Sequence, residues 1–297
     1  MVPESLISDV FRHVEKAGGL GIGCETGVDG LFAVANVQTT ECTASFYEPI
    51  MCLVLQGAKE ACMRDRIVRY GAGDVLIVSH AIPVEAAVIR ASPSEPYAAL
   101  ALQLDLALAR SLYDEIGDVG ETQDSLHSLD AAASDAALID AMHRLFLLSK
   151  DPVEARALAP LVLKEIHFRL LRARHGGMLR QLLHHDSPAS RISKTIATIR
   201  GNYKTNIAVA ELAAECGMSL SAFHEHFKSV TATTPLQYQK ELRLLEARRL
   251  LSSSGLSVAA AAYEVGYESP TQFSREFSRK FGLSPKSQKS EARSLAG

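Results

Sequence analysis

Apolar residues recur along this 297-residue chain with two different periods, and the changes of period divide it into parts. Between Pro3 and Lys16 they lie at helical spacing, which predicts a short amphipathic helix. From Leu31 the period becomes two, which is typical of strands with one buried face. The expected strands cover residues 31–37, 51–56, 59–63, 66–70, 75–79, 84–90 and 97–104.

Turn-forming residues separate these strands, among them Gly71 and Gly73 in one loop and Pro93 and Pro96 in another. Many short strands at such regular spacing favour a β-sandwich or a β-barrel. We expect a cupin-like β-barrel over residues 1–104, preceded by the short helix.

After Asp105 the period returns to that of a helix. One helix is predicted over residues 106–116, a second from an N-cap at Ser134 to about residue 148, and a third that ends near residue 174. Asp151 and Pro152 supply the N-cap and the first residue of the third helix. A helical segment is therefore expected over residues 105–185, and residues 186–190 are predicted to be a linker.

The third helix carries a broad apolar stripe that two arrangements can explain. Packing on neighbouring helices of the same chain is one, and a dimer seam formed by the second and third helices is the other. The stripe consists of Leu158, Leu161, Val162, Glu165, Ile166 and Leu170.

One helix-turn-helix pattern occurs twice in the last third of the chain. In each copy a Val lies eight residues before a Gly, and two Phe residues four apart follow. The Gly suits a tight turn with positive φ, and the Phe pair gives the next helix one buried face. The four positions are Val209, Gly217, Phe223 and Phe227 in the first copy and Val258, Gly266, Phe273 and Phe277 in the second.

The surrounding helices of this third are also predictable. A helix with Ile192, Ile196, Ile199 and Tyr203 on one face is expected to pack under the first copy. A connecting helix of about 18 residues is expected from Thr234–Pro235 to residue 252, with Gly255 marking its end. Its length places the two recognition helices roughly one duplex turn (about 34 Å) apart, so both could enter successive major grooves.

The N-caps of the two copies differ. Ser257 is a good N-cap for the second copy, whereas Ala208 occupies the corresponding position of the first, where Asn206 is the alternative.

Charge is unequally distributed along the chain. Residues 190–297 carry 15 Lys and Arg against 9 Asp and Glu, a net charge of +6, whereas the remainder carries −9. A basic face favours nucleic acid because attraction to phosphate is electrostatic, although a solvated surface explains the charge equally well. On the doubled motif it indicates DNA binding.

Composition excludes several classes of protein. No apolar run approaches the ~18 residues of a membrane span, and the start of the chain lacks a secretory signal pattern, so a cytoplasmic protein is expected. The five cysteines show no Cys-x-x-Cys spacing. Cys42, Cys52 and Cys62 are interpreted as small core residues, with thiol-based sensing of an electrophile or oxidant as the alternative.

Enzymatic chemistry finds little support. A metal-dependent barrel needs several clustered ligands, whereas the strand region holds one histidine, His80, which we interpret as a surface or capping residue. His184, His185 and Asp186 are assigned to the linker surface, because adjacent helical residues point about 100° apart. No phosphate loop or catalytic motif is present. We expect no enzyme activity, no metal and no cofactor.

The barrel is instead interpreted as a binding pocket whose effector-binding residues the sequence does not identify. Arg64, Arg66 and Arg69 could attract an anionic effector, but solvated charge at the hairpin tip around Asp65 is the preferred interpretation.

Several of these segments resemble the AraC/XylS transcriptional regulators. Residues 217–228, 233–249 and especially 265–277 resemble the DNA-binding half of that family, and residues 47–57, 74–79 and 91–97 resemble the cupin-like N-terminal domain of one subgroup. The resemblance implies an AraC-type DNA-binding domain over residues 186–297, with helix-turn-helix units at about 209–229 and 258–280. It also implies operator DNA, a small-molecule effector, a homodimer and possible contact with RNA polymerase, but no membrane.

Outward positions near the start of each recognition helix are expected to contact base edges. Glu225 departs from the family, where a basic residue is usual. It could accept a hydrogen bond from cytosine N4, weaken binding by repelling the DNA backbone, or have no role in DNA binding. The expected base contacts are Ser221, His224, Glu225, Thr271, Ser274 and Arg275, and the expected phosphate contacts are Lys228, Arg279 and Lys280.

Because Arg275 can pair bidentately with guanine and Glu225 is acidic, we expect the second unit to carry more of the sequence-specific contact. Two alternative functions remain: a metal-dependent cupin enzyme fused to a DNA-binding module, and a ligand-independent regulator whose N-terminal part only dimerises.

Overall fold

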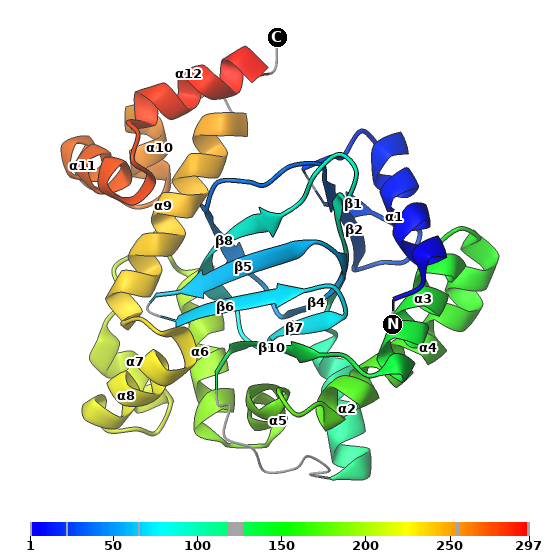
Figure 1. The fold of residues 1–297 in the computed structure, drawn as a ribbon. Helices are drawn as coiled ribbons and strands as arrows, with labels where there is room; N and C mark the ends of the chain where they lie inside the picture. Colours follow the sequence, from blue (N-terminus) through cyan, green and yellow to red (C-terminus); the bar gives the residue numbers. More distant parts are fainter. Residues whose placement is uncertain (1, 22, 65, 118–126, 254–255, 296–297) are drawn as a thin grey trace. The chain divides into compact units, whose positions relative to one another are not determined.

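The computed structural model describes residues 2–21, 23–64, 66–117, 127–253 and 256–295. The chain forms two compact units, shown in Figure 1. One covers residues 1–43 and 47–190, and the other covers residues 44–46 and 191–297.

Two antiparallel sheets form the β-barrel of the first unit, which confirms the predicted fold class (Figure 1). The six-stranded sheet has the order β1-β2-β9-β4-β7-β10, and the four-stranded sheet has the order β3-β8-β5-β6. The strands are β1 (Cys24–Glu25), β2 (Leu31–Asn36), β3 (Thr43–Tyr47), β4 (Ile50–Gln56), β5 (Ala58–Met63), β6 (Arg66–Gly71), β7 (Asp74–Val78), β8 (Ile82–Arg90), β9 (Tyr97–Gln103) and β10 (Leu129–Ala133).

The sequence pattern missed β1, β3 and β10. Strand β10 lies within the predicted helical segment of residues 105–185, and it pairs with β7 so that Leu129 lies opposite Val78. It contains one large apolar residue followed by Asp130 and three alanines, so it shows no period of two. Strand β10 therefore lies between the first and second predicted helices of this segment, where no element was predicted.

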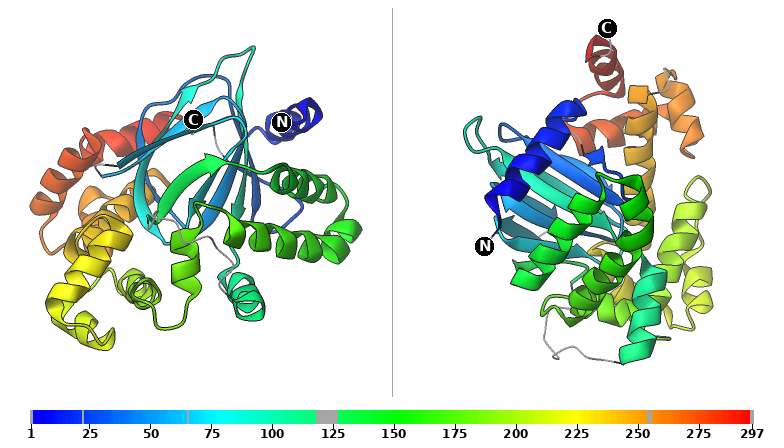
Figure 2. Two further views of the ribbon diagram at one scale, coloured as in Figure 1. Left: turned by 60° about the horizontal axis from the view of Figure 1, so that its bottom comes forward. Right: turned by 90° about the vertical axis from the view of Figure 1, so that its right-hand side faces the viewer.

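Helices cover the outer face of the six-stranded sheet, as the two views of Figure 2 show. Helix α1 (Glu4–Lys16) is the predicted amphipathic helix, and it buries Leu6, Val10 and Val14 in the same core as Met51 of β4. The other helices of this unit are α2 (Leu106–Ile116), α3 (Ala136–Leu148), α4 (Pro152–Arg172) and α5 (Gly177–Leu183).

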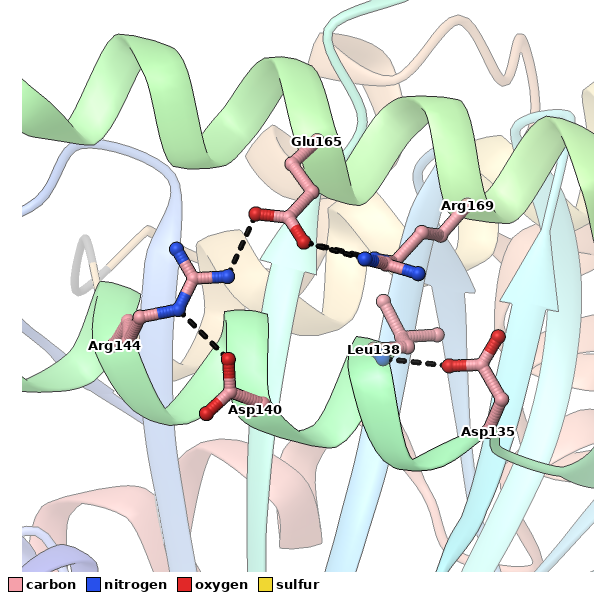
Figure 3. Close-up of polar contacts among 6 residues, drawn as sticks. All are labelled: Asp135, Leu138, Asp140, Arg144, Glu165 and Arg169. Atoms are coloured by element: carbon pink, nitrogen blue, oxygen red, sulfur yellow. Dashed lines mark hydrogen bonds and ion pairs between the residues drawn. The ribbon is translucent and has the colours of Figure 1, made fainter.

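Helices α3 and α4 are joined by a chain of ion pairs (Figure 3). The Arg144 guanidinium contacts Asp140 at 2.8 Å and Glu165 at 2.6 Å, and Arg169 contacts Glu165 at 2.7 Å. The hydrogen bond from Arg144, followed by that from Arg169, holds the pKa of Glu165 below its ordinary value. These partly exposed pairs fix the register of the two helices more than they stabilise them.

The N-cap of α3 corrects a prediction. The Asp135 carboxylate accepts a hydrogen bond from the Leu138 amide at 2.6 Å, so Asp135 is the N-cap and not Ser134 (Figure 3). Asp151 caps α4 with Pro152 in the first turn, as predicted.

The second unit is helical. Helix α6 begins at Pro188, so part of the predicted linker over residues 186–190 is already helical. Tyr203 lies beyond the end of α6 and packs in the core of the second helix-turn-helix, contrary to the prediction that it packs under the first. Its helices are α6 (Pro188–Gly201), α7 (Val209–Glu215), α8 (Leu220–Thr231), α9 (Pro235–Ser253), α10 (Val258–Glu264), α11 (Pro270–Phe281) and α12 (Pro285–Leu295).

Helix α9 is the predicted connecting helix, and Figure 1 shows α7 and α8 near one end of it and α10 and α11 near the other. Gly255, expected to mark its end, falls outside the described residues, as does Asp65 of the predicted hairpin tip. Over the described part of the chain, no helix combines the length and the apolar character needed to span a membrane.

Candidate nucleic-acid interface

Helices α7 and α8, and again α10 and α11, form the two helix-turn-helix units expected from the doubled motif. Both turns are closed by the same backbone hydrogen bonds. The Met218 amide donates to the Ala213 carbonyl at 3.0 Å, and the Tyr267 amide donates to the Ala262 carbonyl at 3.0 Å. The repeat in the sequence is therefore a repeat in backbone geometry.

A glycine with positive φ starts each turn, as predicted. Gly217 has φ +62° and Gly266 has φ +87°. Their surroundings differ, because a Cβ atom on Gly217 would meet only the Arg191 guanidinium at 3.7 Å, whereas one on Gly266 would lie 2.0 Å from the Lys204 carbonyl oxygen. The second turn is thus packed tightly against backbone and the first is not.

Serines cap both recognition helices. The Ser219 hydroxyl accepts from the Ala222 amide on α8, and the Ser269 hydroxyl accepts from the Gln272 amide on α11, both at 3.3 Å. Ser257 caps α10 as predicted, whereas Ala208 precedes α7 and the first turn of that helix has no side-chain cap. Asn206 does not replace it.

Two buried phenylalanines orient each recognition helix. The rings of Phe223 and Phe227 lie 5.8 Å apart, and those of Phe273 and Phe277 lie 5.5 Å apart, measured between centroids. All four side chains are fully buried, so the opposite face of each helix is turned outward.

The predicted base-contacting residues lie on these outward faces. Five of them are exposed: Ser221, His224 and Glu225 on α8, and Thr271 and Arg275 on α11. The sixth, Ser274, is half-buried, and its hydroxyl donates to the Pro270 carbonyl at 2.8 Å. Of the six, Ser274 is the one whose hydroxyl is already engaged with its own helix.

The predicted phosphate contacts also differ in their surroundings. Lys228 and Arg279 are exposed. The Lys280 ammonium is half-buried and lies 3.8 Å from the Glu241 carboxylate, so it must exchange that partner to bind a phosphate. His226 is half-buried beside the helix core, as expected.

A polar network connects α11 to α9 and to the turn before α11. The Tyr267 hydroxyl donates to the Glu276 carboxylate at 2.9 Å, and the Lys240 ammonium lies 3.3 Å from it. Burial alone would raise the pKa of Glu276, yet the pKa is lowered because Tyr267, Gln272 and Lys240 all favour the carboxylate. Glu276 therefore stays charged and ties α11 to α9.

His80 is where the sequence interpretation fails in the first unit. We expected a surface residue, but the side chain is 1% exposed. Its Nδ1 lies 2.9 Å from the Ser79 hydroxyl and 3.2 Å from the Ser128 hydroxyl, and its Nε2 lies 3.3 Å from the Ala189 carbonyl. Burial lowers the pKa of His80 to about 4, so it is a neutral core histidine.

Other candidate ligands and charges of the first unit lie at its surface or in ion pairs. His184 and His185 are exposed, and the part of the chain that the structure describes holds no cluster of three or more metal-ligating side chains. Arg66 pairs with Asp130 at 2.7 Å and Arg69 with Glu60 at 2.6 Å.

The cysteines are all free, and they divide between core and surface. Cys52 is buried as expected, Cys62 is half-buried, and Cys42 is exposed, which contradicts its interpretation as a core residue.

The sequence assigned no effector-binding residue. In the structure Lys59 of β5 and Tyr70 of β6 lie directly opposite each other. The sequence offers one sign that Lys59 faces the barrel interior. It lies two residues before the buried Ala61, and side chains two residues apart on a strand point to the same face.

Comparison with known sequences places these features in a family context. Residues 27–178 match the AraC-type transcriptional regulator N-terminus, and residues 212–290 match a helix-turn-helix domain. The chain is 40% identical over 95 residues to the HTH-type transcriptional regulator AlkR of Acinetobacter baylyi, and 33% identical over 101 residues to the transcriptional activator RhaS of Escherichia coli. The matched segments span only about a third of each protein: 32% of this chain and 31% of AlkR in the first case, and 34% of this chain and 36% of RhaS in the second.

The fold has solved counterparts. The crystal structure of ToxT from Vibrio cholerae O395 aligns with 88% of this chain and 97% of its own, with a TM-score of 0.53 and 12% identity. ToxT from strain SCE256, bound to an unsaturated fatty acid, aligns with 88% of this chain and 93% of its own, with a TM-score of 0.51 and 11% identity. At this identity the likeness concerns the fold alone.

Proposed function

Because the chain belongs to the AraC-type transcriptional regulators, we propose that it binds operator DNA through both helix-turn-helix units, under the control of a small molecule held in its N-terminal barrel. The observation that carries the DNA-binding part is the pair of recognition helices, each with a buried phenylalanine face and an exposed polar face.

Arg275 is the proposed centre of sequence recognition. It is exposed in the second turn of α11, near the start of the helix, where side chains of a recognition helix meet base edges. A guanidinium can donate two hydrogen bonds to O6 and N7 of guanine, which distinguishes guanine from the other bases. Ser221, His224, Glu225, Thr271 and Ser274 are the further proposed base contacts, with Lys228, Arg279 and Lys280 on the phosphates.

The test is selection of binding sites from random duplex DNA, with full-length wild type and Arg275→Ala, followed by fluorescence anisotropy on the selected duplex. We expect Arg275→Ala to weaken binding by roughly 1–3 kcal/mol and to relax the base preference at one position. Arg249→Ala is the matched control, because Arg249 is exposed on α9 and pairs with Glu246. Unchanged affinity and specificity in Arg275→Ala would refute the assignment.

The control by a small molecule is supported by the barrel itself. A closed pair of sheets with helices outside is a common frame for a ligand site. ToxT, which has the same fold, has been crystallised with a fatty acid. We propose no catalytic role, because the regulators AlkR and RhaS are transcription factors.

A homodimer is part of the same proposal. Along α4, Val162, Ile166 and Leu170 are buried within the unit, whereas Leu158 is 44% and Leu161 67% exposed. The apolar stripe thus has an inner part that packs in the chain and an outer part that suits a second copy. Contact with RNA polymerase would follow from its role as a regulator and rests on family membership alone.

A further inference from the structure

Side chains of the six-stranded sheet alternate between two environments. Met51 and Leu53 of β4 and Leu100 of β9 pack in the core that includes the outer helices. The residues between them point the other way, toward the barrel interior. On this inner face Cys52 lies opposite Ala101, and Val54 lies opposite Ala99. All four side chains are small and buried.

The four-stranded sheet turns two polar residues toward the same interior. Lys59 and Tyr70 are direct cross-strand partners, and the next pair on the same face is Ala61 with Val68, both buried. Lys59 is also paired with the buried Val88 of β8. Lys59 itself is half-buried, and a lysine on such a face is unusual because an ammonium is costly to remove from water.

Three more polar groups gather around Lys59. Its ammonium lies 5.5 Å from the centroid of the Tyr47 ring. Burial acts to lower the pKa of Lys59, yet the pKa is raised because Tyr47 and Cys52 favour the charged form. The pKa of Tyr97 is raised by burial first and then by its neighbours Cys52, Tyr70 and Tyr47. Five side chains from five strands thus converge in one polar cluster inside the barrel.

The cluster contains a cation without an anion. Over the described residues, neither an ion pair nor a carboxylate is recorded for Lys59. The nearby arginines do not supply further positive charge, because Arg66 and Arg69 are each paired with a carboxylate. A single positive charge that contacts Tyr47 but has no carboxylate partner matches a ligand with a single negative charge.

The cluster also contains an unused donor. Tyr70 is 3% exposed, and within the described part of the chain its hydroxyl has no hydrogen-bond partner. A buried hydroxyl left unpaired is unfavourable, and a bound acceptor would satisfy it. Burial, together with Cys52 and Tyr47, raises the pKa of Tyr70, so the phenol keeps its proton and can donate it to a hydrogen bond.

We infer that this cluster binds the carboxylate of a small organic acid, with Lys59 neutralising the charge and the Tyr70 hydroxyl donating a hydrogen bond. A phosphate dianion would leave one charge uncompensated, because the cluster holds one cation. This inference rests on the proposed function, since it names the chemical class of the effector.

The test is isothermal titration calorimetry of the full-length protein at pH 7 with two acids and their neutral counterparts. The pairs are sodium octanoate with 1-octanol, and sodium benzoate with benzamide. We expect at least one acid to bind and its neutral counterpart to bind at least about tenfold more weakly, since a hydrogen bond to a charged group contributes roughly 1.5–3 kcal/mol. Lys59→Met should lose about tenfold or more in affinity for that acid.

Tyr70→Phe distinguishes a ligand contact from a structural role. Removing an unpaired buried hydroxyl should leave the thermal stability of the ligand-free protein unchanged or increased, while affinity for the acid falls several-fold. Lys164→Met is the matched control, because Lys164 is exposed on α4 and pairs with Glu115. It should keep wild-type affinity.

The outcomes separate this inference from the proposed function. No binding of either acid, equal binding of the neutral compounds, or wild-type affinity in Lys59→Met would overturn the inference. Operator binding is measured in the same variants without acid. Wild-type protein that selects no DNA sequence would refute the proposed function, whereas specific DNA binding with no affinity for acids would refute the inference alone.

Discussion

Replacing Gly266 by alanine should damage the second helix-turn-helix far more than the equivalent change at Gly217 damages the first. Both glycines have positive φ, which costs a non-glycine residue roughly 1–2 kcal/mol. Alanine also makes the unfolded chain less flexible than glycine does, and this effect offsets about 0.4–1 kcal/mol of the cost. For Gly217→Ala, where the added Cβ meets only a mobile guanidinium, the net cost is therefore about 1 kcal/mol.

Gly266→Ala carries an additional steric cost. The new Cβ would lie 2.0 Å from the carbonyl oxygen of Lys204 and 2.7 Å from its carbonyl carbon, so the backbone there must move. That segment is held by Arg243, which donates to the Tyr203 carbonyl at 2.6 Å and to the Thr205 carbonyl at 3.0 Å. Each hydrogen bond that is lost removes about 1 kcal/mol. We expect a total cost of about 3–5 kcal/mol.

Urea unfolding of the full-length variants, followed by circular dichroism, measures both costs. Hydrogen-exchange mass spectrometry of peptides from α7–α8 and α10–α11 assigns the loss to one unit or the other. Gly266→Ala should lose protection in α10–α11, and Gly217→Ala should remain close to wild type. Equal losses for the two variants would show that the packing of Lys204 against the second turn does not decide the result.

Three further predictions concern stability and assembly. Ala208→Ser should stabilise the helical unit of residues 191–297 by about 1 kcal/mol in urea unfolding, because it supplies the N-cap that α7 in the first helix-turn-helix lacks. No gain would mean that water already satisfies the amides at the start of α7. His80 has a folded pKa of about 4 against 6.5 when unfolded, so its contribution is fully present above pH 6.5 and about 3 kcal/mol is lost as the pH falls to 4. His80→Gln should flatten that loss in urea unfolding across this range, and an unchanged pH profile would contradict the argument. Leu161→Glu should shift the protein toward monomer in sedimentation velocity without unfolding it, whereas an unaltered oligomeric state would exclude α4 as the seam.

Sequence alone predicted helices α6 to α11 of the second unit, although not α12, because the information for these helices is local. A glycine at a turn, a serine before a helix and two phenylalanines one turn apart each determine the conformation of a few neighbouring residues. The outward face of α11 then follows from the inward face. Tyr203 was misassigned since its contacts come from residues far along the chain, which helical spacing does not reveal.

The first unit was less predictable for a related physical reason. The strands with clear alternation were found, but β10 is a strand because β7 offers an open edge, not because its own side chains require it. His80 is buried because residues near 128 and 189 converge on it. The cluster around Lys59 likewise depends on the register of β5 with β6 and on β4 and β9 in the opposite sheet. Such long-range pairings leave no periodic signal.

The two helix-turn-helix units share a backbone and a serine cap on each recognition helix, but they differ in the other contacts that hold them. In the second, Ser257 caps α10, Lys204 pairs with Glu264, and Glu276 ties α11 to Tyr267. In the first, α7 begins without a side-chain cap. A recognition helix that is already ordered loses less entropy on binding, so more of its contact energy appears as affinity and discrimination. This adds to the chemical advantage of Arg275 over Glu225, and the selected DNA site should therefore be best defined in the half that α11 contacts. A site whose preference lies mainly under α8 would show that exposed side-chain chemistry on the first unit outweighs this difference in order.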